Sequence, residues 1–322
     1  MKWRYFSKDI QTWQLSSVIH VYYSYEKCVR DDYKMFYPNQ IQRLNRIDKF
    51  SLQPKKRSKF RAIAGKGYYK LLRYMLWYTG HIRYAHNRSL QYLQYTYFAH
   101  KTPLLRKLRD VDMQYQYNKI INLKLAVKKL DGIILLPGET FSYWRLIGKP
   151  SAGKGYVPGM VLHCGEFRMG IGGGLCQLSN LIYWMSLHTP LTVVERYRHS
   201  YDVFPDSNRT QPFGTGATCV YPYRDLMIRN DTDANFQLQL RVGEEFLEGS
   251  WLSDRIPEHR YEIIEKNHHF KPEYWGGFSR HNEIWQSNYT IDGSFISEEF
   301  ITENHALMMY SPFLPPSSQT CM

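Results

Sequence analysis

The stretch that decides the fold is Gly170-Ile171-Gly172-Gly173-Gly174-Leu175-Cys176-Gln177-Leu178-Ser179, because it joins an irregular backbone to an apolar helix. Consecutive glycines disfavour regular structure and let another group approach the backbone closely. The helix is predicted from Leu175 to about Leu187, because apolar residues recur there at helical spacing. Its core face holds Leu178, Leu181, Ile182 and Met185.

Helix and strand patterns precede this stretch. Residues 112–131 carry an apolar stripe and are followed by Gly132, which predicts a helix with a stop. Ile133 to Leu136 suits a short buried strand. Met160–Leu162 and Phe167–Ile171 flank Gly165-Glu166 and predict a hairpin.

The residues after the helix read mainly as strands. Asn230 to Asp233 predicts a turn between two of them. The strand candidates are Leu191–Arg198, Ala217–Tyr221, Leu226–Arg229, Phe236–Val242 and Phe246–Trp251. We therefore expect an α+β fold with an antiparallel, β-rich domain in which a Gly-rich loop leads into a helix.

Charge divides the chain unevenly. Residues 1–110 hold 23 Lys and Arg against 6 Asp and Glu, whereas residues 111–322 hold 19 against 23. We expect residues 1–100 to form a basic, aromatic, mainly helical N-terminal region, with helices over 61–100 and a basic linker near Pro54–Lys59. Residues 101–254 would form the main domain and 255–322 a mixed C-terminal extension. The basic region suits an anionic membrane surface, although a solvated basic face without a partner fits as well.

Composition limits the cellular setting. The 5 Cys occur at positions 28, 164, 176, 219 and 321 without C-x-x-C spacing, which favours reduced thiols. The first residues lack an apolar leader segment, and no run reaches about 20 apolar residues. We expect a cytoplasmic protein, peripheral to the inner leaflet of the membrane.

Cys176 is the residue most suited to chemistry. Its place in the first helical turn would favour a thiolate, so we expect it to be the most reactive thiol. Backbone N–H groups near Gly174 and Leu175 could bind an oxyanion. A tight turn over a small buried Cys fits the same residues, whereas a phosphate-binding loop is disfavoured because no Gly-Lys-Ser/Thr follows.

A cysteine nucleophile needs a base, and His199 is the candidate. Strand alternation would place Glu195, Tyr197 and His199 on one face. A lone His at a strand end can also be a surface or capping residue. The scattered Cys and His residues lack paired metal-ligand spacing, so we expect no metal and no cofactor.

Four stretches of the chain resemble the VanW family, in order and in spacing. The resemblance covers roughly residues 101–252, and Leu187–Thr192 is a further stretch that resembles the family. The stretches are Leu136–Ser142, Gly172–Ser179, Glu195-Arg196 with His199-Ser200, and Asp225-Leu226 with Arg229-Asn230.

The resemblance implies a role in glycopeptide resistance and peptidoglycan metabolism. Some proteins with VanW domains are L,D-transpeptidases that use a Cys, which implies Cys176 as nucleophile, His199 as base, and Glu195 or Asp225 as orienter. Substrate would contact the loop and its neighbours: Gly172, Gly173, Gly174, Gln177, Ser179 and Arg196.

The chain departs from the family pattern at two places. Gly216 replaces the acidic residue that most members carry before Ala-Thr, and Gly174 stands where a Ser-His-Gly-Cys signature would have His. Catalytic activity is therefore open.

The first hypothesis is a Cys-dependent acyl transferase or hydrolase acting on peptidoglycan stem peptides. The alternative is a non-catalytic module that binds stem peptides or precursors through the Gly-rich loop. A nucleic-acid partner is disfavoured, because no nucleic-acid-binding motif is present.

Overall fold

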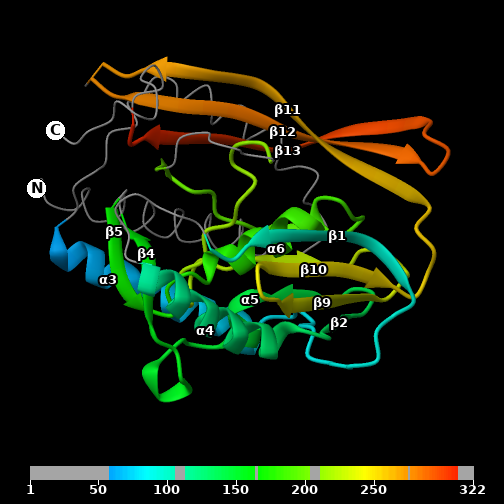
Figure 1. The fold of residues 1–322 in the computed structure, drawn as a ribbon, viewed down its shortest axis with the longest axis horizontal. Coiled ribbons are helices and arrows are strands. Elements are labelled where there is room, and N and C mark those ends of the chain that lie inside the picture. Colours follow the sequence, from blue (N-terminus) through cyan, green and yellow to red (C-terminus); the bar gives the residue numbers. More distant parts are fainter. Residues whose placement is uncertain (1–57, 106–112, 164–165, 204–210, 275, 311–322) are drawn as a thin grey trace, which may run out of the picture. The chain divides into compact units, whose positions relative to one another are not determined.

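A computed structural model describes residues 58–105, 113–163, 166–203, 211–274 and 276–310 (Figure 1). Contacts divide the chain into a unit of residues 1–51 and a unit of residues 52–322. Every described residue belongs to the second unit. The predictions made for residues 1–57, for Cys28, Cys164 and Cys321, and for the last residues of the chain lie outside the described residues.

One antiparallel sheet organises the centre of this unit, in the order β1-β10-β9-β2. Its strands are β1 (Tyr95–Pro103), β10 (Phe246–Ser253), β9 (Phe236–Val242) and β2 (Ile134–Leu135). Helix α4 (Met113–Leu130) packs on β9, and helix α6 (Cys176–Ser186) packs on β10 and β1. Trp251 of β10 is fully buried and donates its indole N–H to Ser186 of α6 over 3.0 Å.

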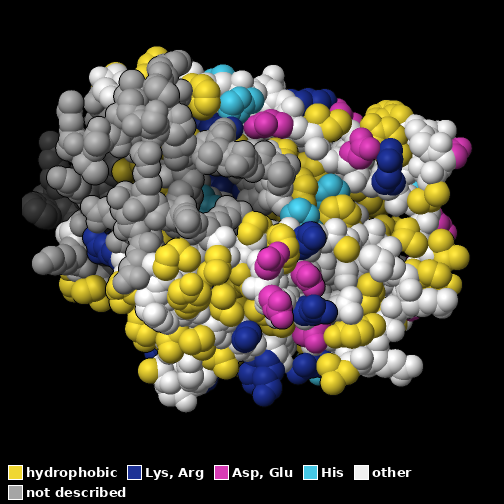
Figure 2. All heavy atoms as spheres, in the orientation of Figure 1, with side chains coloured by type: hydrophobic (Ala, Val, Ile, Leu, Met, Phe, Trp, Pro, Cys, Tyr) yellow, Lys and Arg dark blue, Asp and Glu magenta, His cyan; other side chains and the backbone are white. Residues whose placement is uncertain are grey.

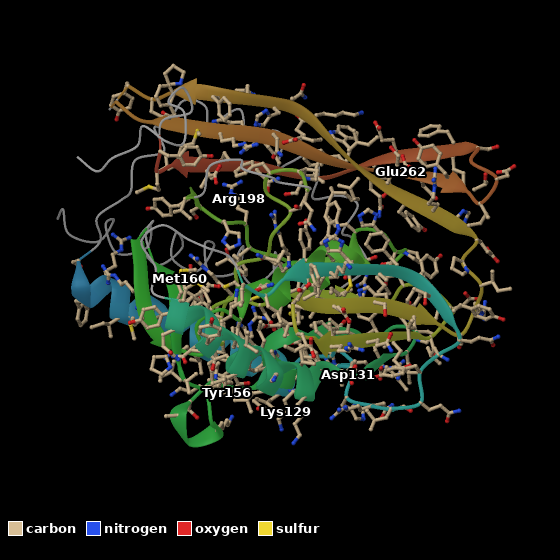
Figure 3. All side chains as sticks on the ribbon, in the orientation of Figure 1. Lys129, Asp131, Tyr156, Met160, Arg198 and Glu262 are labelled. Carbon is tan, nitrogen blue, oxygen red and sulfur yellow. The ribbon has the colours of Figure 1, made fainter. Side chains whose placement is uncertain are left out.

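Helix α4 ends where the sequence predicts. Leu123 and Leu130 are fully buried, and Gly132 follows with φ +79°. The Asp131 carboxylate, labelled in Figure 3, accepts the backbone N–H of Leu240 over 2.9 Å. This bond ties the end of α4 to β9.

A second, smaller sheet has the order β3-β8-β6 and lies next to a short helix. The elements are β3 (Thr140–Ser142), α5 (Tyr143–Ile147), β6 (Thr192–Glu195) and β8 (Met227–Arg229). Two strands, β4 (Pro158–His163) and β5 (Glu166–Ile171), form the predicted hairpin, preceded by the 3-10 turn η2 (Ala152–Lys154).

The C-terminal segment forms a third sheet together with β7, where only a mixed extension was expected. Its order is β11-β12-β13-β7, from β11 (His259–Pro272), β12 (Phe278–Thr290), β13 (Phe295–Met308) and β7 (Tyr201–Asp202). The long strands pair antiparallel, and β7 joins β13 in parallel. These strands carry many polar side chains, so the alternation of apolar and polar residues that indicates a strand is weak in their sequence.

The α+β class and the antiparallel character are confirmed, as is the Gly-rich loop that leads into α6. The prediction of helices over residues 61–100 is only partly correct. Helix α3 (Lys59–Thr79) forms, but Tyr95–Pro103 is strand β1, held by the ladder to β10. The domain boundaries remain predictions. Strand β1 crosses the boundary that was predicted between residues 100 and 101.

Two strand predictions after α6 are wrong in extent. Strand β6 stops at Glu195, so strand alternation does not reach Tyr197 or His199. Residues 217–221 form no strand and hold a single bridge, between Val220 and Arg224. Instead of joining a sheet ladder, the backbone of Ala217 hydrogen-bonds α6, through its N–H to Asn180 and through its carbonyl to Ser179.

The Gly-rich loop is held by close backbone packing. Gly172 and Gly174 have φ +78° and +91°, which side-chain-bearing residues rarely adopt. A Cβ on Gly173 would overlap the backbone of Gly159 on β4, and one on Gly174 would overlap the Lys119 side chain of α4. The start of α6 is therefore positioned by its contacts with β4 and α4.

We predict that Gly173→Ala destabilises the fold by about 2 kcal/mol or more, because the added methyl group overlaps backbone that cannot rotate away. Gly153→Ala is the matched control, since a Cβ there meets nothing within 4 Å. The control should stay within about 0.5 kcal/mol of the parent protein. Urea unfolding of both variants measures the difference. Equal stability of the two would contradict the close packing.

Candidate functional site

The N–H groups of the loop glycines are already paired. Gly172 donates to Val157 over 3.1 Å, Gly173 to Gly170 over 3.0 Å, and Gly174 to Met160 over 3.0 Å. Met160 on β4 is labelled in Figure 3. Among the described residues, the N–H groups of Leu175 and Cys176 donate to no backbone carbonyl. Gly174 therefore does not offer the oxyanion donor that the sequence suggested. Leu175 keeps a donor at the start of α6, while the Cys176 N–H hydrogen-bonds the thiol of its own residue.

The Cys176 thiol is shielded from water in this arrangement. Burial raises its pKa, although hydrogen bonds from the backbone N–H groups of Cys219 and Cys176 act in the opposite direction. The residue as a whole is half-buried, so the shielding is concentrated at the sulfur. This shift is opposite to the sequence expectation of a stabilised thiolate. Removal from solvent outweighs the helix N-terminus at this position.

The surroundings of Cys176 include groups that sequence reasoning missed. Tyr143 of α5 is fully buried and donates its hydroxyl to the Leu175 carbonyl over 2.9 Å. Ser179 donates to the Ala217 carbonyl over 2.8 Å. Burial holds the pKa of the Cys219 thiol well above its usual range. The first turn of α6 thus packs against α5 and the segment 217–219.

His199 lies against the same segment. Its Nδ1 is 2.9 Å from the Thr218 hydroxyl oxygen, and its Nε2 is 3.5 Å from the Asn180 side-chain oxygen. Burial, together with the charge of Arg196, lowers the pKa of His199 to about 4. The imidazole is therefore neutral at physiological pH, which is the form that can accept a proton.

Asn180 and the segment 217–219 connect the two proposed catalytic side chains. Asn180 follows Cys176 by four residues on α6, so both lie on one helix face. Thr218 contacts His199, while the neighbouring Cys219 contacts the Cys176 thiol through its N–H. Within the described residues no hydrogen bond joins Cys176 to His199. Helical spacing from Cys176 was the signal that could have revealed Asn180.

Glu195 and Asp225 are engaged in a buried network that includes Arg73. Arg73 of α3 pairs with Glu195, and Glu195 accepts the backbone N–H of Asp225 over 3.1 Å. The Asp225 carboxylate accepts the Ser142 hydroxyl and two backbone N–H groups, from Trp144 and Leu226, each over 2.9 Å.

Burial and the charge of Glu195 raise the pKa of Asp225 to about 7. The charge of Arg73 and the hydrogen bonds from Ser142 and the Trp144 N–H lower this pKa, but burial outweighs them. The contacts of both acids serve to join α3, α5, β6 and β8. Their assignment as orienters of His199 stays a prediction.

Arg196 and Gln177, two of the residues predicted to contact substrate, also hydrogen-bond other parts of the chain. Arg196 donates to the carbonyls of Gly214 and Gly216, and burial lowers its pKa. Gln177 donates to the Thr102 hydroxyl and the Pro103 carbonyl of β1, each over 2.9 Å. Arg198, labelled in Figure 3, contacts His305 of β13. These bonds hold the loops around the start of α6.

Gly216 lies directly beside the candidate base. A Cβ at this position would lie 2.9 Å from the Asn180 side-chain oxygen and 3.1 Å from His199 Nε2. Position 216, where most family members carry an acidic residue, thus adjoins His199. The surrounding side chains leave little room there for a residue larger than glycine.

The described residues contain no group of three or more His, Cys, Asp or Glu that could hold a metal ion. In the same part of the chain, no helix is both long enough and apolar enough to cross a membrane.

Comparisons with known proteins agree with the sequence motifs. Residues 118–252 match the family described as VanW like protein. The vancomycin B-type resistance protein VanW of Enterococcus faecalis (strain ATCC 700802 / V583) is 38% identical over 180 residues, which cover 56% of this chain and 66% of that protein. The uncharacterized protein YoaR of Bacillus subtilis (strain 168) is 34% identical over 82 residues, which cover 26% of this chain and 27% of that protein.

The chain thus spans just under two thirds of the length of the first relative and about a quarter of the second. No solved structure matches it.

We predict that Cys176 reacts slowly with iodoacetamide at pH 7, because burial raises its pKa and leaves little thiolate. Its rate should rise about tenfold per pH unit and keep rising beyond pH 9, as expected below a raised pKa. Mass spectrometry of the labelled peptide, with N-acetylcysteine as reference, measures this. A plateau below pH 8 would show a thiolate already present.

We predict that His199 makes the fold sensitive to acid. Its folded pKa, about 4, lies below the ordinary value of 6.5. The unfolded chain therefore binds a proton first as pH falls, and stability is lost between pH 6.5 and 4. The loss is about 3 kcal/mol for this group. His199→Gln should flatten the dependence of unfolding free energy on pH in this window. Identical slopes for His199→Gln and the parent would contradict the assignment.

Proposed function

The chain belongs to the VanW family, and we propose that it acts in glycopeptide resistance and peptidoglycan metabolism. The match to the vancomycin B-type resistance protein of E. faecalis supports this role. The substrate we propose is a peptidoglycan stem peptide or its precursor. The chemistry we propose is acyl transfer or hydrolysis through Cys176, similar to that of a Cys-dependent L,D-transpeptidase.

The observation that carries this proposal is the arrangement around the first turn of α6. The Cys176 thiol and the neutral His199 ring both lie against the segment 216–219, beside Asn180. A neutral imidazole can take the thiol proton when substrate binds, so a resting thiolate is not required. The raised pKa of Cys176 is compatible with this order of events.

The proposed reaction follows the chemistry of a cysteine acyl transferase. The Cys176 sulfur attacks the stem-peptide carbonyl as His199 accepts the thiol proton. The N–H groups of Leu175 and Cys176 stabilise the oxyanion. The protonated His199 then gives its proton to the leaving amine, and a thioester remains on Cys176. A second amine or a water molecule releases the acyl group and restores the thiol.

A non-catalytic binding module is the second candidate, and the shielded thiol of Cys176 favours it. The paired N–H groups of Gly172, Gly173 and Gly174 do not favour binding through the loop amides. A module of this kind would bind the stem peptide through side chains around the start of α6.

We predict that the full chain forms a thioester with a stem peptide, seen as a mass increase on the peptide containing Cys176. Cys176→Ala should lower turnover at least 1000-fold, since the nucleophile is removed. It should leave peptide binding, measured by calorimetry, within about threefold because the site is otherwise intact. The control is Cys321→Ser, which alters a thiol far along the sequence. This variant should keep both the turnover and the peptide binding of the parent protein.

Other outcomes decide between the candidates. Binding without turnover in the parent protein, and equal binding by Cys176→Ala, would support the module and exclude the enzyme. Absence of binding to any stem peptide or lipid-linked precursor would overturn both.

A further inference from the structure

Helix α3 has an unusual distribution of side chains. Its inner face holds Arg73, Leu76 and Trp77, which are buried against the main domain. Arg73 is paired with Glu195 and also donates to the Tyr223 carbonyl over 3.3 Å. A charged residue thus anchors the inner side of the helix.

The outer face of α3 is apolar and exposed along the whole helix. Phe60, Leu71 and Tyr78 are 83%, 60% and 73% exposed. The exposed apolar residues of this stripe recur at spacings of three and four on either side of Gly67, and they are Phe60 and Ile63 before it and Leu71, Tyr74, Met75 and Tyr78 after it. In Figure 2 hydrophobic side chains gather, with Lys and Arg among them, in the lower left, where Figure 1 draws α4 in front of part of α3. In water this arrangement leaves apolar surface unburied while it buries an arginine.

Charge on α3 has one sign. The helix sequence contains no Asp or Glu, and Arg61, Lys66 and Lys70 are exposed. Helical spacing places Arg61 and Lys70 at the edges of the apolar stripe, whereas Lys66, seven residues before Arg73, lies on the side of Arg73. Aromatic and aliphatic residues on one side of a helix with Lys and Arg next to them are typical of helices that lie in a membrane interface. Anionic headgroups would meet the bases while the apolar side chains enter the acyl boundary.

We propose that α3 docks this protein on an anionic lipid surface through its outer face. This inference goes beyond the proposed function and does not depend on it. The helix lies in the plane of the interface, and its inner face keeps the main domain attached.

Charge argues against the other occupants of this face. A second copy would bring another α3, whose Arg61, Lys66 and Lys70 would repel the first. Residues 1–51 of the same chain hold 9 Lys and Arg against 5 Asp and Glu, so they do not complement the helix either. A lipid surface offers both the negative charge and the apolar layer.

The test is sedimentation of the full chain with vesicles of phosphatidylcholine alone or mixed with phosphatidylglycerol. Binding to the mixed vesicles should be at least tenfold stronger than to the neutral ones. It should fall at least fivefold between low salt and about 0.5 M salt, where exposed charges are screened.

Two pairs of variants separate the apolar and charged contributions. Leu71→Ser with Tyr78→Ser should weaken binding at least tenfold, and Ile256→Ser with Ile291→Ser is the control, since both isoleucines are 66% exposed elsewhere. Lys66→Glu with Lys70→Glu should abolish the preference for anionic vesicles. The control for charge is Lys128→Glu with Lys129→Glu on α4, which should change binding less than twofold.

Several results would overturn the proposal. They are equal binding to neutral and anionic vesicles, equal loss in the test and control variants, or no vesicle binding. Analytical ultracentrifugation without lipid can give a further result that would overturn the proposal. A dimer that Leu71→Ser with Tyr78→Ser converts to monomer would make a second copy the occupant of this face.

Discussion

The close approach of Gly173 to Gly159 is the constraint on which the site depends. A Cβ at Gly173 would overlap the backbone of β4, so the loop can pack there only as glycine. The approach, together with the positive φ of Gly174, determines where α6 begins and therefore where Cys176 stands. The same packing uses the loop N–H groups for structure, because Gly172, Gly173 and Gly174 all donate to nearby carbonyls. A feature that suggests a ligand loop in the sequence is thus mainly a means of positioning one helix.

Burial then determines the chemistry that remains available. Around the first turn of α6 the thiols of Cys176 and Cys219 both have raised pKa values, and His199 has a lowered one. Each of these shifts favours the neutral form, as expected where removal from solvent dominates. The resting site is therefore uncharged at the thiol and the imidazole. Any nucleophilic step must create its charges after substrate has entered, in the presence of donors such as the Leu175 N–H.

The sequence predicted the parts of the fold that depend on local pattern. Helix α4, strand β9 and the β4–β5 hairpin follow from periodicity and turn residues, and the Gly-rich loop follows from composition. Prediction was poorer where contacts distant in sequence decide. Tyr95–Pro103 is a strand because it pairs with β10, some 150 residues later. The long strands of the third sheet have many polar side chains, which removes the alternation that signals a strand. For the site, the sequence named Cys176 and His199 as a candidate pair, but the contacts of His199 with Asn180 and Thr218 came only from the tertiary structure.

The buried pair of Arg73 and Glu195 connects the candidate site with the outer face of α3. Glu195 was expected to orient His199, yet its carboxylate holds Arg73 and the Asp225 backbone. A buried ion pair contributes little net stability compared with apolar packing, but it is costly to separate because one charge would be left unpaired. Such an ion pair is suited to holding α3 in one orientation relative to β6. With Arg73 held inward, the helical period directs Leu71 and Tyr78 outward, so the acid that holds Arg73 also determines which face of α3 meets the surroundings.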